Sequence, residues 1–374
     1  MKISNPFSTS GYVAPEYFCD RETETTQIVE AIRSSRNLTL ISIRRMGKTA
    51  LLKHVEHLLP AKEYEVIYLD LMPTQSSAEF LNLLGTALIN VRNKERSFID
   101  KIIKTLARLR PVISYDSLTG QPVVTLDVTG TTESYNGLKL VMDIISGIKK
   151  RIVVILDEFQ QINHYEEANI EASLRSIVQQ YPAISFIFSG SNKHMIETMF
   201  TSTTRPFFGS ADMMNLEAIP AESYSNFIQS HFQAGSRTIG QEEIAEILQW
   251  CRYHTYYVQY FCNRLYATEI KAINNETLNK VKIDILDSFA PSYNTYQRLL
   301  TKPQYALLQA IAVENEVSKP HSGDFIEKYK LKTSSTVKAS LDSLANKEVI
   351  IYHNSAWQVY DVFLMRWLEY KAKG

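Results

Sequence analysis

Two short groups of residues in this chain are of the types that bind phosphate and a metal ion. The first is Gly47-Lys48-Thr49, which follows the apolar or β-branched run 38–41 and opens the apolar run 50–52. Strand, loop and helix in this order are typical of a P-loop, because backbone N–H groups and the helix N-terminus point at the same phosphate oxygens. In such a loop Lys48 would reach the β- and γ-phosphates, and the Thr49 hydroxyl would ligate Mg²⁺.

The loop departs from the usual pattern at one position. The pattern is G-x-x-x-x-G-K-[ST], and Ser42 stands where its first glycine belongs. Because Gly-Lys-Thr also occurs by chance, an ordinary strand-to-helix turn with a surface lysine is the alternative. The loop alone therefore indicates a nucleotide site without establishing one.

The second group is Asp157-Glu158, which directly follows the five apolar residues Ile152–Leu156. A buried strand that ends in acid delivers its carboxylates to the edge of a parallel sheet where α/β proteins bind ligands. Asp157 would hold Mg²⁺ directly or through water, and Glu158 would act as the general base that polarises the attacking water. Together with Gly47-Lys48-Thr49, this pair predicts a nucleotide site.

Two further positions could act on the same ligand. The run 184–188 is apolar except for Ser185 and is followed by small polar residues. Ser191 or Asn192 could therefore contact the γ-phosphate or the water, unless the strand simply ends in a turn. Arg205 could stabilise transition-state charge in its own subunit or a neighbour's. A solvated loop arginine is the alternative.

The elements that would position these residues predict three domains. Residues 1–220 are expected to form an α/β core, a P-loop NTPase parallel sheet flanked by helices, in which 76–110 is helical and a β-hairpin is inserted at about 111–128. Asp20 is a candidate N-cap for the first helix. Residues 221–300 are helical throughout and suit a lid. Residues 301–374 show three helices, a hairpin and a closing helix, which is typical of a winged helix-turn-helix.

The third of those helices, at about 335–345, would enter the major groove if the domain binds DNA. Four lysines would then meet phosphates: Lys328, Lys330, Lys332 and Lys338. The helix exposes only Lys338 and Lys347 as cations, however, and the hairpin has no Arg or Lys. Protein packing or autoinhibition is therefore the competing use of the domain.

Composition excludes several classes of protein. Lys+Arg and Asp+Glu both number 40 among 374 residues, so no global charge favours nucleic acid or an acidic partner. Cys19, Cys251 and Cys262 lack metal or disulfide spacing. The N-terminus has no apolar signal core, and no stretch reaches the length of a membrane span. We expect a cytoplasmic protein without a membrane partner.

Taken in order, the motifs resemble the archaeal-type ATPases of the STAND class, P-loop NTPases related to AAA+ proteins. The resemblance is carried by the segments 18–22, 43–49, 155–159, 188–191, 256–259 and 359–363. It implies ATP or ADP rather than a guanine nucleotide. It also implies that the segment with Phe18 and Arg21 borders the adenine. The phosphates would lie among Arg44, Arg45, Met46, Gly47, Lys48, Thr49 and Ala50.

The resemblance further implies a nucleotide-controlled regulatory switch. ADP would hold the lid and winged helix against the core, and ATP would release them or permit self-assembly or binding of a protein partner. Differential contacts are expected at Arg44, Arg45, Ser191 and Arg205. The chain has Tyr253-His254-Thr255 where the family usually has Gly-x-Pro, and Ser210 where it tends to have Arg, so hydrolysis could be slow.

Two other functions remain open at this stage. One is a DNA-binding initiator or transposition-helper-like ATPase that holds duplex through the winged helix. The other is a nucleotide-binding scaffold with little turnover. Salt-dependent duplex binding would favour the former, and unchanged phosphate release after Glu158→Gln would favour the latter.

Overall fold

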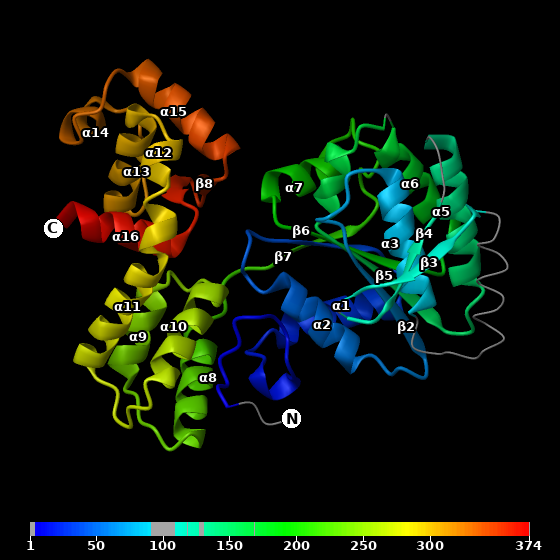
Figure 1. The fold of residues 1–374 in the computed structure, drawn as a ribbon, viewed down its shortest axis with the longest axis horizontal. Helices are drawn as coiled ribbons and strands as arrows, with labels where there is room; N and C mark the ends of the chain where they lie inside the picture. Colours follow the sequence, from blue (N-terminus) through cyan, green and yellow to red (C-terminus); the bar gives the residue numbers. More distant parts are fainter. Residues whose placement is uncertain (1–3, 91–108, 118, 127–130, 168, 374) are drawn as a thin grey trace. The chain divides into compact units, whose positions relative to one another are not determined.

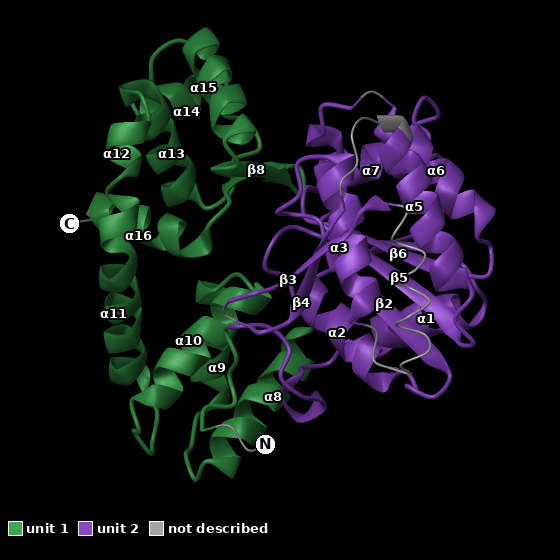
Figure 2. Cartoon of the chain, turned by 45° about the vertical axis from the view of Figure 1, so that its right-hand side comes forward, with its two compact units in different colours: residues 1–9, 219–374 green, residues 10–218 purple. Residues whose placement is uncertain are grey.

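The computed structural model describes residues 4–90, 109–117, 119–126, 131–167 and 169–373 (Figure 1). The chain divides into two compact units, which Figure 2 shows in different colours. Residues 10–218 are called the sheet unit here, and residues 1–9 with 219–374 are called the helical unit. Each is described by itself.

The sheet unit is built on five parallel strands in the order β2-β5-β6-β1-β7. They are β1 (Leu38–Ile41), β2 (Tyr64–Asp70), β5 (Arg151–Asp157), β6 (Ser185–Gly190) and β7 (Asp212–Asn215). The expected parallel sheet is therefore confirmed. Strand β6 pairs directly with β1, the strand that precedes the P-loop, with Leu38 opposite Ile187. The carboxyl ends of β1, β5 and β6 consequently lie next to one another.

Helices cover both faces of this sheet (Figure 1). Alternate residues of β5 point to opposite faces, so that Val154 joins one apolar core and Val153 and Ile155 join the other. The helices of this unit are α1 (Glu22–Arg33), α2 (Lys48–Leu58), α3 (Ser77–Ile89), α5 (Thr131–Ser146), α6 (Ile170–Gln180) and α7 (Lys193–Thr201). The core that contains Val154 also draws on α3, α5, α6 and α7, and the core that contains Val153 and Ile155 draws on α1 and α2.

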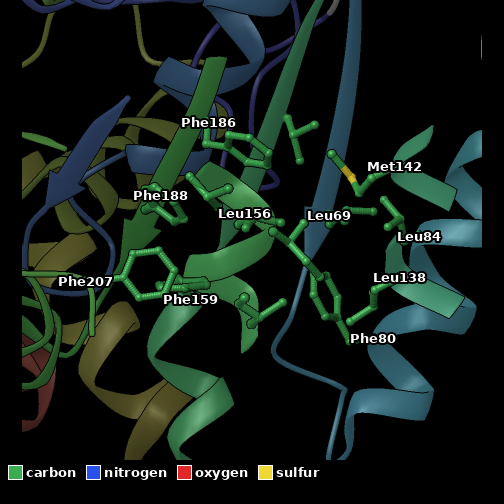
Figure 3. A pocket seen from close by; sticks show the side chains of 14 residues that line it. Leu69, Phe80, Leu84, Leu138, Met142, Leu156, Phe159, Phe186, Phe188 and Phe207 are labelled. Carbon is green, nitrogen blue, oxygen red and sulfur yellow. The ribbon is translucent and has the colours of Figure 1, made fainter. Parts of the chain in front are cut away.

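The larger core contains a small apolar cavity of about 20 Å³ (Figure 3). Its lining side chains are all apolar and include Leu69, Phe80, Met142, Phe159 and Phe207. A space of this size could admit a water molecule only if polar partners faced it, and the lining provides none. The cavity is therefore a packing void between layers.

The hairpin predicted for the sheet unit is confirmed, and the predicted helix 76–110 can be compared only in part. The predicted hairpin is present as β3 (Val112–Tyr115) and β4 (Pro122–Thr125), which pair antiparallel as a separate sheet. The predicted helix 76–110 is described only as α3, because residues 91–108 lie outside the described part of the chain.

Asp20 does not cap α1, contrary to expectation. Asp20 and Arg21 have φ angles of 55° and 75°, and the N-cap residue is Arg21 without a side-chain hydrogen bond to the helix. Two successive left-handed residues turn the chain differently from an extended N-cap, which is why Asp20 is not the cap. A short 3₁₀ helix, η1 (Pro15–Tyr17), precedes this turn.

The helical unit contains the lid and winged helix predicted from the sequence. The lid helices are α8 (Ala221–Ala234), α9 (Gln241–Trp250), α10 (Thr255–Ala267), α11 (Asn275–Tyr293) and α12 (Tyr296–Leu299). The winged helix consists of α13 (Lys302–Glu314), α14 (Gly323–Lys328), α15 (Ser334–Asn346), β8 (Ile350–His353), β9 (Ala356–Val359) and α16 (Val362–Lys373). Three helices, a hairpin and a closing helix confirm the predicted order.

Helix α16 joins these two parts. The fully buried ring of Phe363 lies 4.7 Å from that of Tyr257 and 5.5 Å from that of Trp250, centroid to centroid. Arg366 of the same helix donates a hydrogen bond to the carbonyl of Trp250 at 3.0 Å. The border that we predicted near residue 300 therefore falls inside one compact unit with a shared aromatic core.

Among the described residues, no helix combines the length and the apolar character that crossing a membrane requires.

Candidate active site

The loop from Ser42 to Gly47 connects β1 with α2 and supplies the centre of the site. Gly47 is the N-cap of α2 with φ 94°, a conformation that costs glycine little and strains other residues. Ser42, at the position of the missing glycine, is 4% exposed and uses its side chain within the loop. Its hydroxyl donates to the carbonyl of Ile43 at 2.9 Å and accepts from Lys48 at 3.2 Å.

Lys48 is the first residue of α2 and is almost fully buried. Its ammonium donates to the carbonyls of Ser42 and Ile43, both at 3.3 Å. Burial is the main cause that lowers the pKa of Lys48, while the nearby charges of Glu158 and Asp157 oppose the shift. Among the described residues, no carboxylate forms an ion pair with it. A buried cation that meets only neutral acceptors suits an incoming anion such as phosphate.

Asp157, at the end of β5, meets the loop through Thr49. Its Oδ2 accepts hydrogen bonds from the Thr49 hydroxyl at 2.8 Å and from the Tyr68 hydroxyl at 2.5 Å. Its Oδ1 accepts from the backbone N–H of Glu158 at 3.1 Å. Mg²⁺ usually takes one or two protein oxygens and fills its other positions with water and phosphate. A hydroxyl and a carboxylate in contact at the loop fit such an ion.

Glu158 is linked to β6 and to the loop through Ser191. Its Oε2 accepts from the Ser191 hydroxyl at 2.6 Å, from the Ser191 backbone N–H at 3.2 Å and from the Gln160 amide at 2.5 Å. Arg44 donates through Nε to the same Ser191 hydroxyl at 3.3 Å. Asn192, the alternative to Ser191, caps α7 by accepting from the N–H of Met195 at 3.1 Å. Ser191 thus contacts both Glu158 and Arg44, and the Asn192 side chain caps α7.

Arg205 is held elsewhere in the sheet unit. Its guanidinium forms an ion pair with Glu171 of α6 at 2.5 Å and donates to Asn163. Among the described residues, no hydrogen bond or ion pair joins it to Lys48, Asp157 or Ser191. A role of Arg205 at the phosphates stays a prediction.

The segment that was expected to border the adenine packs on α2. The Phe18 ring stacks on His54 with centroids 4.3 Å apart, and the Tyr12 hydroxyl lies 3.1 Å from Nδ1 of the same histidine. The buried Arg21 guanidinium is bound by Glu24 at 2.6 Å and by the carbonyl of Glu217 at 2.7 Å. Phe18 therefore lies on the helix that begins at the P-loop, whereas the Arg21 side chain is engaged in holding its own segment.

The remaining loop residues differ in what they offer to a ligand. Met46 is 6% exposed and belongs to the core between α1, α2 and the sheet, so only its backbone faces the loop. Arg45 is exposed with φ 67°, and Ala50 is half-buried in the first turn of α2. Arg44 of this loop contacts the Ser191 hydroxyl, and a contact of Arg45 with phosphate stays a prediction.

Three residues at this edge were missed from the sequence. Gln160 follows Glu158 by two positions, and Tyr68 and Asp70 lie on β2, where Asp70 is opposite Asp157. Burial chiefly raises the pKa of Asp70, the N–H of Met72 opposes the shift, and the charges of Asp157 and Glu158 add to it. A second buried strand that ends in acid was the available signal for Asp70. For Tyr68 the sequence offered no signal except that it lies two positions before Asp70, on the same face of the strand.

A family model of an ATPase domain predominantly from Archaea matches residues 18–261, well over half of the chain. The chain belongs to this family. The match extends through α8 and α9 into α10, so much of the predicted lid lies within the family's ATPase domain. A second model, described as a probable winged helix domain, matches residues 291–370. The comparison with curated proteins finds no match.

Three solved structures of similar fold come from Pyrococcus abyssi and Aeropyrum pernix. The Walker-type ATPase PABY2304 of Pyrococcus abyssi has a TM-score of 0.66 and 15% identity, over 97% of this chain and 99% of that chain. The ORC2 protein of Aeropyrum pernix, solved as ADPNP-ADP complexes, has a TM-score of 0.56 and 12% identity over 99% and 98%. The ORC1 protein of the same organism, solved in complex with DNA, has a TM-score of 0.53 and 11% identity over 99% and 97%. At these identities the likeness establishes the P-loop ATPase fold.

Proposed function

We propose that this ATPase-family protein is a Mg²⁺-dependent ATPase of the STAND class whose bound nucleotide acts as a regulatory switch. The observation that carries the proposal is one hydrogen-bonded network at the carboxyl ends of three adjacent strands. In it Thr49 contacts Asp157, and Ser191 contacts both Arg44 and Glu158. These are the residue types and positions that phosphoryl transfer requires.

In this proposal the loop and the first turn of α2 would bind the phosphates. Lys48 would exchange its neutral acceptors for β- and γ-phosphate oxygens, and the helix N-terminus would add backbone N–H donors. Thr49 and Asp157 would hold Mg²⁺, which supplies charge neutralisation at the phosphates. Glu158 would take a proton from the attacking water as the water oxygen bonds to the γ-phosphorus and the bond to ADP breaks.

Ser191 provides a way to distinguish ATP from ADP. In the described arrangement its hydroxyl donates to Glu158 and accepts from Arg44, which leaves Glu158 engaged. A γ-phosphate would compete for Arg44 and Ser191 and so free Glu158 for the water. ADP has no γ-phosphate and would leave these contacts in place. The two nucleotides would therefore stabilise different states of the site.

Replacement of Arg44 by Gln is expected to weaken ATP binding by about 10- to 100-fold, the range of a lost charge-assisted hydrogen bond. ADP affinity should change by no more than about two-fold, because ADP does not reach Ser191 in this proposal. Titration with fluorescent ATP and ADP analogues measures both. Arg45→Gln, which removes the same charge from the neighbouring exposed arginine of the loop, is measured beside it for comparison. Equal losses for both nucleotides in Arg44→Gln would refute the discrimination.

Purification of the unmodified protein tests the proposed function itself. The protein is purified without added nucleotide, and any nucleotide that remains bound is identified. Tightly held ADP supports a switch. An empty site that hydrolyses ATP rapidly would contradict the switch while leaving an ATPase.

A second candidate function, a DNA-binding initiator or transposition-helper-like ATPase, is favoured by the surface of the winged helix. The exposed first turn of α15 carries Ser334 and Ser335, and Lys332 and Lys338 are exposed beside it. Lys328 is less available, because Glu314 pairs with it at 2.5 Å. The ORC1 structure in complex with DNA supports this use of the fold.

Lys338→Glu is expected to weaken duplex binding and to reduce its salt dependence, with the log–log slope falling by about one, because one phosphate contact is lost. Binding is measured by fluorescence anisotropy across a range of salt concentrations. Lys371→Glu, an exposed change on α16, is the control. Absence of duplex binding by the unmodified protein would instead favour a protein partner or self-assembly.

The cellular location belongs to the same proposal. Cys19, Cys251 and Cys262 are buried, and none of them forms a disulfide bond in the described part of the chain. Cysteines that stay outside disulfides are usual in reducing compartments. We therefore place the protein in the cytoplasm.

A further inference from the structure

Tyr68 joins the site network from β2, the edge strand beside β5. Its hydroxyl donates to Oδ2 of Asp157 at 2.5 Å. The same oxygen accepts from the Thr49 hydroxyl at 2.8 Å. Two donors from different elements, a neighbouring strand and the P-loop helix, therefore converge on one carboxylate oxygen.

The ring of Tyr68 is also held in place. The ammonium of Lys53, one turn into α2, lies 3.8 Å from the ring centroid, and Lys53 pairs with Glu56 at 2.9 Å. A cation over the face of a tyrosine is favourable. Helix α2 thus contacts Tyr68 through Lys53 and contacts Asp157 through Thr49, so the hydroxyl of Tyr68 has little freedom to turn away.

The carboxylate of Asp157 needs such support. The terminal torsion of an aspartate is soft, and a buried carboxylate can rotate unless its oxygens are bonded. Within the part of the chain that the structure describes, Oδ1 accepts a hydrogen bond only from the adjacent backbone N–H of Glu158. Without Tyr68, the Thr49 hydroxyl would be the only side-chain donor to Oδ2 among the described residues. The Thr49 hydroxyl is also the group that would direct an oxygen lone pair at the metal.

We propose that Tyr68 is a positioning residue for the metal ion: it holds Asp157 in the orientation in which the carboxylate and the Thr49 hydroxyl together face Mg²⁺. This inference rests on the proposed function, because it concerns the same nucleotide site. Tyr68 itself touches neither nucleotide nor metal in this account. Partners of this kind, which orient a ligand without binding the metal, typically contribute 10- to 100-fold to metal affinity.

The test is the dependence of nucleotide binding on Mg²⁺. Tyr68→Phe removes only the hydroxyl and keeps the ring beneath Lys53. Binding of a fluorescent ADP analogue is titrated in EDTA and at increasing Mg²⁺ concentrations. We expect the Mg²⁺ concentration at half-maximal effect to rise about 10-fold or more. Affinity in EDTA should stay within about two-fold of the unmodified protein, since the phosphate-binding lysine and loop are unchanged.

Tyr64→Phe is the matched control. Tyr64 lies on the same strand, and its hydroxyl accepts from Arg151 at 3.2 Å at the opposite end of the strand from Asp157. The control loses a hydroxyl of the same kind from β2, and its Mg²⁺ curve should match that of the unmodified protein. Thermal unfolding of all three proteins without nucleotide reports any general loss of stability.

The outcomes separate this inference from the proposed function. Identical Mg²⁺ curves for Tyr68→Phe and the unmodified protein would overturn the inference and leave the proposed function standing. Equal weakening in EDTA and in Mg²⁺, with lower thermal stability, would also overturn it, because Tyr68 would then have a structural role only. Failure of the unmodified protein to bind any nucleotide would overturn the proposed function, and this inference with it.

Discussion

Glu158→Gln is expected to lower the rate of phosphate release from ATP by about 10²- to 10⁴-fold, the usual contribution of a positioned general base. Glutamine keeps the size of the side chain and an oxygen that can accept from Ser191, but it cannot take a proton from water. Affinities for ATP and ADP should stay nearly unchanged, because Lys48, Thr49 and Asp157 are intact. Single-turnover phosphate release and nucleotide titration measure the two effects separately.

Asp70→Asn provides a matched control for that experiment. Asp70 lies opposite Asp157 at the end of the neighbouring strand, and its Oδ1 accepts from the N–H of Met72 at 3.0 Å. The control removes a carboxylate charge from the same edge of the sheet without touching Ser191, and we expect less than about a three-fold change in rate. Unchanged phosphate release in Glu158→Gln would contradict the assigned role and favour a nucleotide-binding scaffold.

Phe363→Ala is expected to destabilise the helical unit by about 3–5 kcal/mol, the usual cost of a buried phenylalanine truncated to alanine. The ring is fully buried, with the rings of Tyr257, Tyr260 and Phe289 at centroid distances of 4.7, 5.5 and 5.6 Å. These neighbours come from α10 and α11, so the truncation opens a cavity where the winged helix meets the lid. Few surface substitutions have effects of this size.

Tryptophan fluorescence suits the measurement, since Trp250, Trp357 and Trp367 are the three tryptophans of the chain and all lie in the helical unit. Denaturant unfolding followed at these residues reports that unit alone. Tyr370→Ala on the exposed face of α16 is the control, with an expected change within about 0.5 kcal/mol. Two separate transitions in the unmodified protein would contradict a shared core and restore the lid and winged helix as independent domains.

Much of the fold could be predicted from local pattern. The apolar run Ile152–Leu156 could only be a buried strand of a two-sided sheet, and the structure places alternate residues in two separate cores. The three helices and the hairpin after residue 301 could be predicted because helix caps and turn residues act locally. Thr333, the N-cap of α15, is an example. The Asp20 prediction was wrong because a side chain suited to capping does not by itself set the backbone, and Asp20 and Arg21 have left-handed φ angles.

Contacts between strands could not be predicted in this way. Asp70 and Tyr68 lie far from Asp157 in the sequence, and only the register of β2 against β5 brings them to it. The contacts of Ser191 with Glu158 and Arg44 likewise depended on the pairing of β6 with β5 and β1. The ion pair of Arg205 with Glu171 depended on the packing of its loop against α6.

The sequence by itself therefore determined which residue types are available for the proposed chemistry: a lysine for phosphate, a hydroxyl and a carboxylate for Mg²⁺, and a second carboxylate for water. These follow from residue types and from short-range order along the chain. The tertiary structure alone decided which of them meet, that Ser191 links Arg44 to Glu158, and that Tyr68 shares Asp157 with Thr49. The physical reason is that a parallel sheet joins the ends of strands distant in sequence, and its register is set by packing over the whole unit.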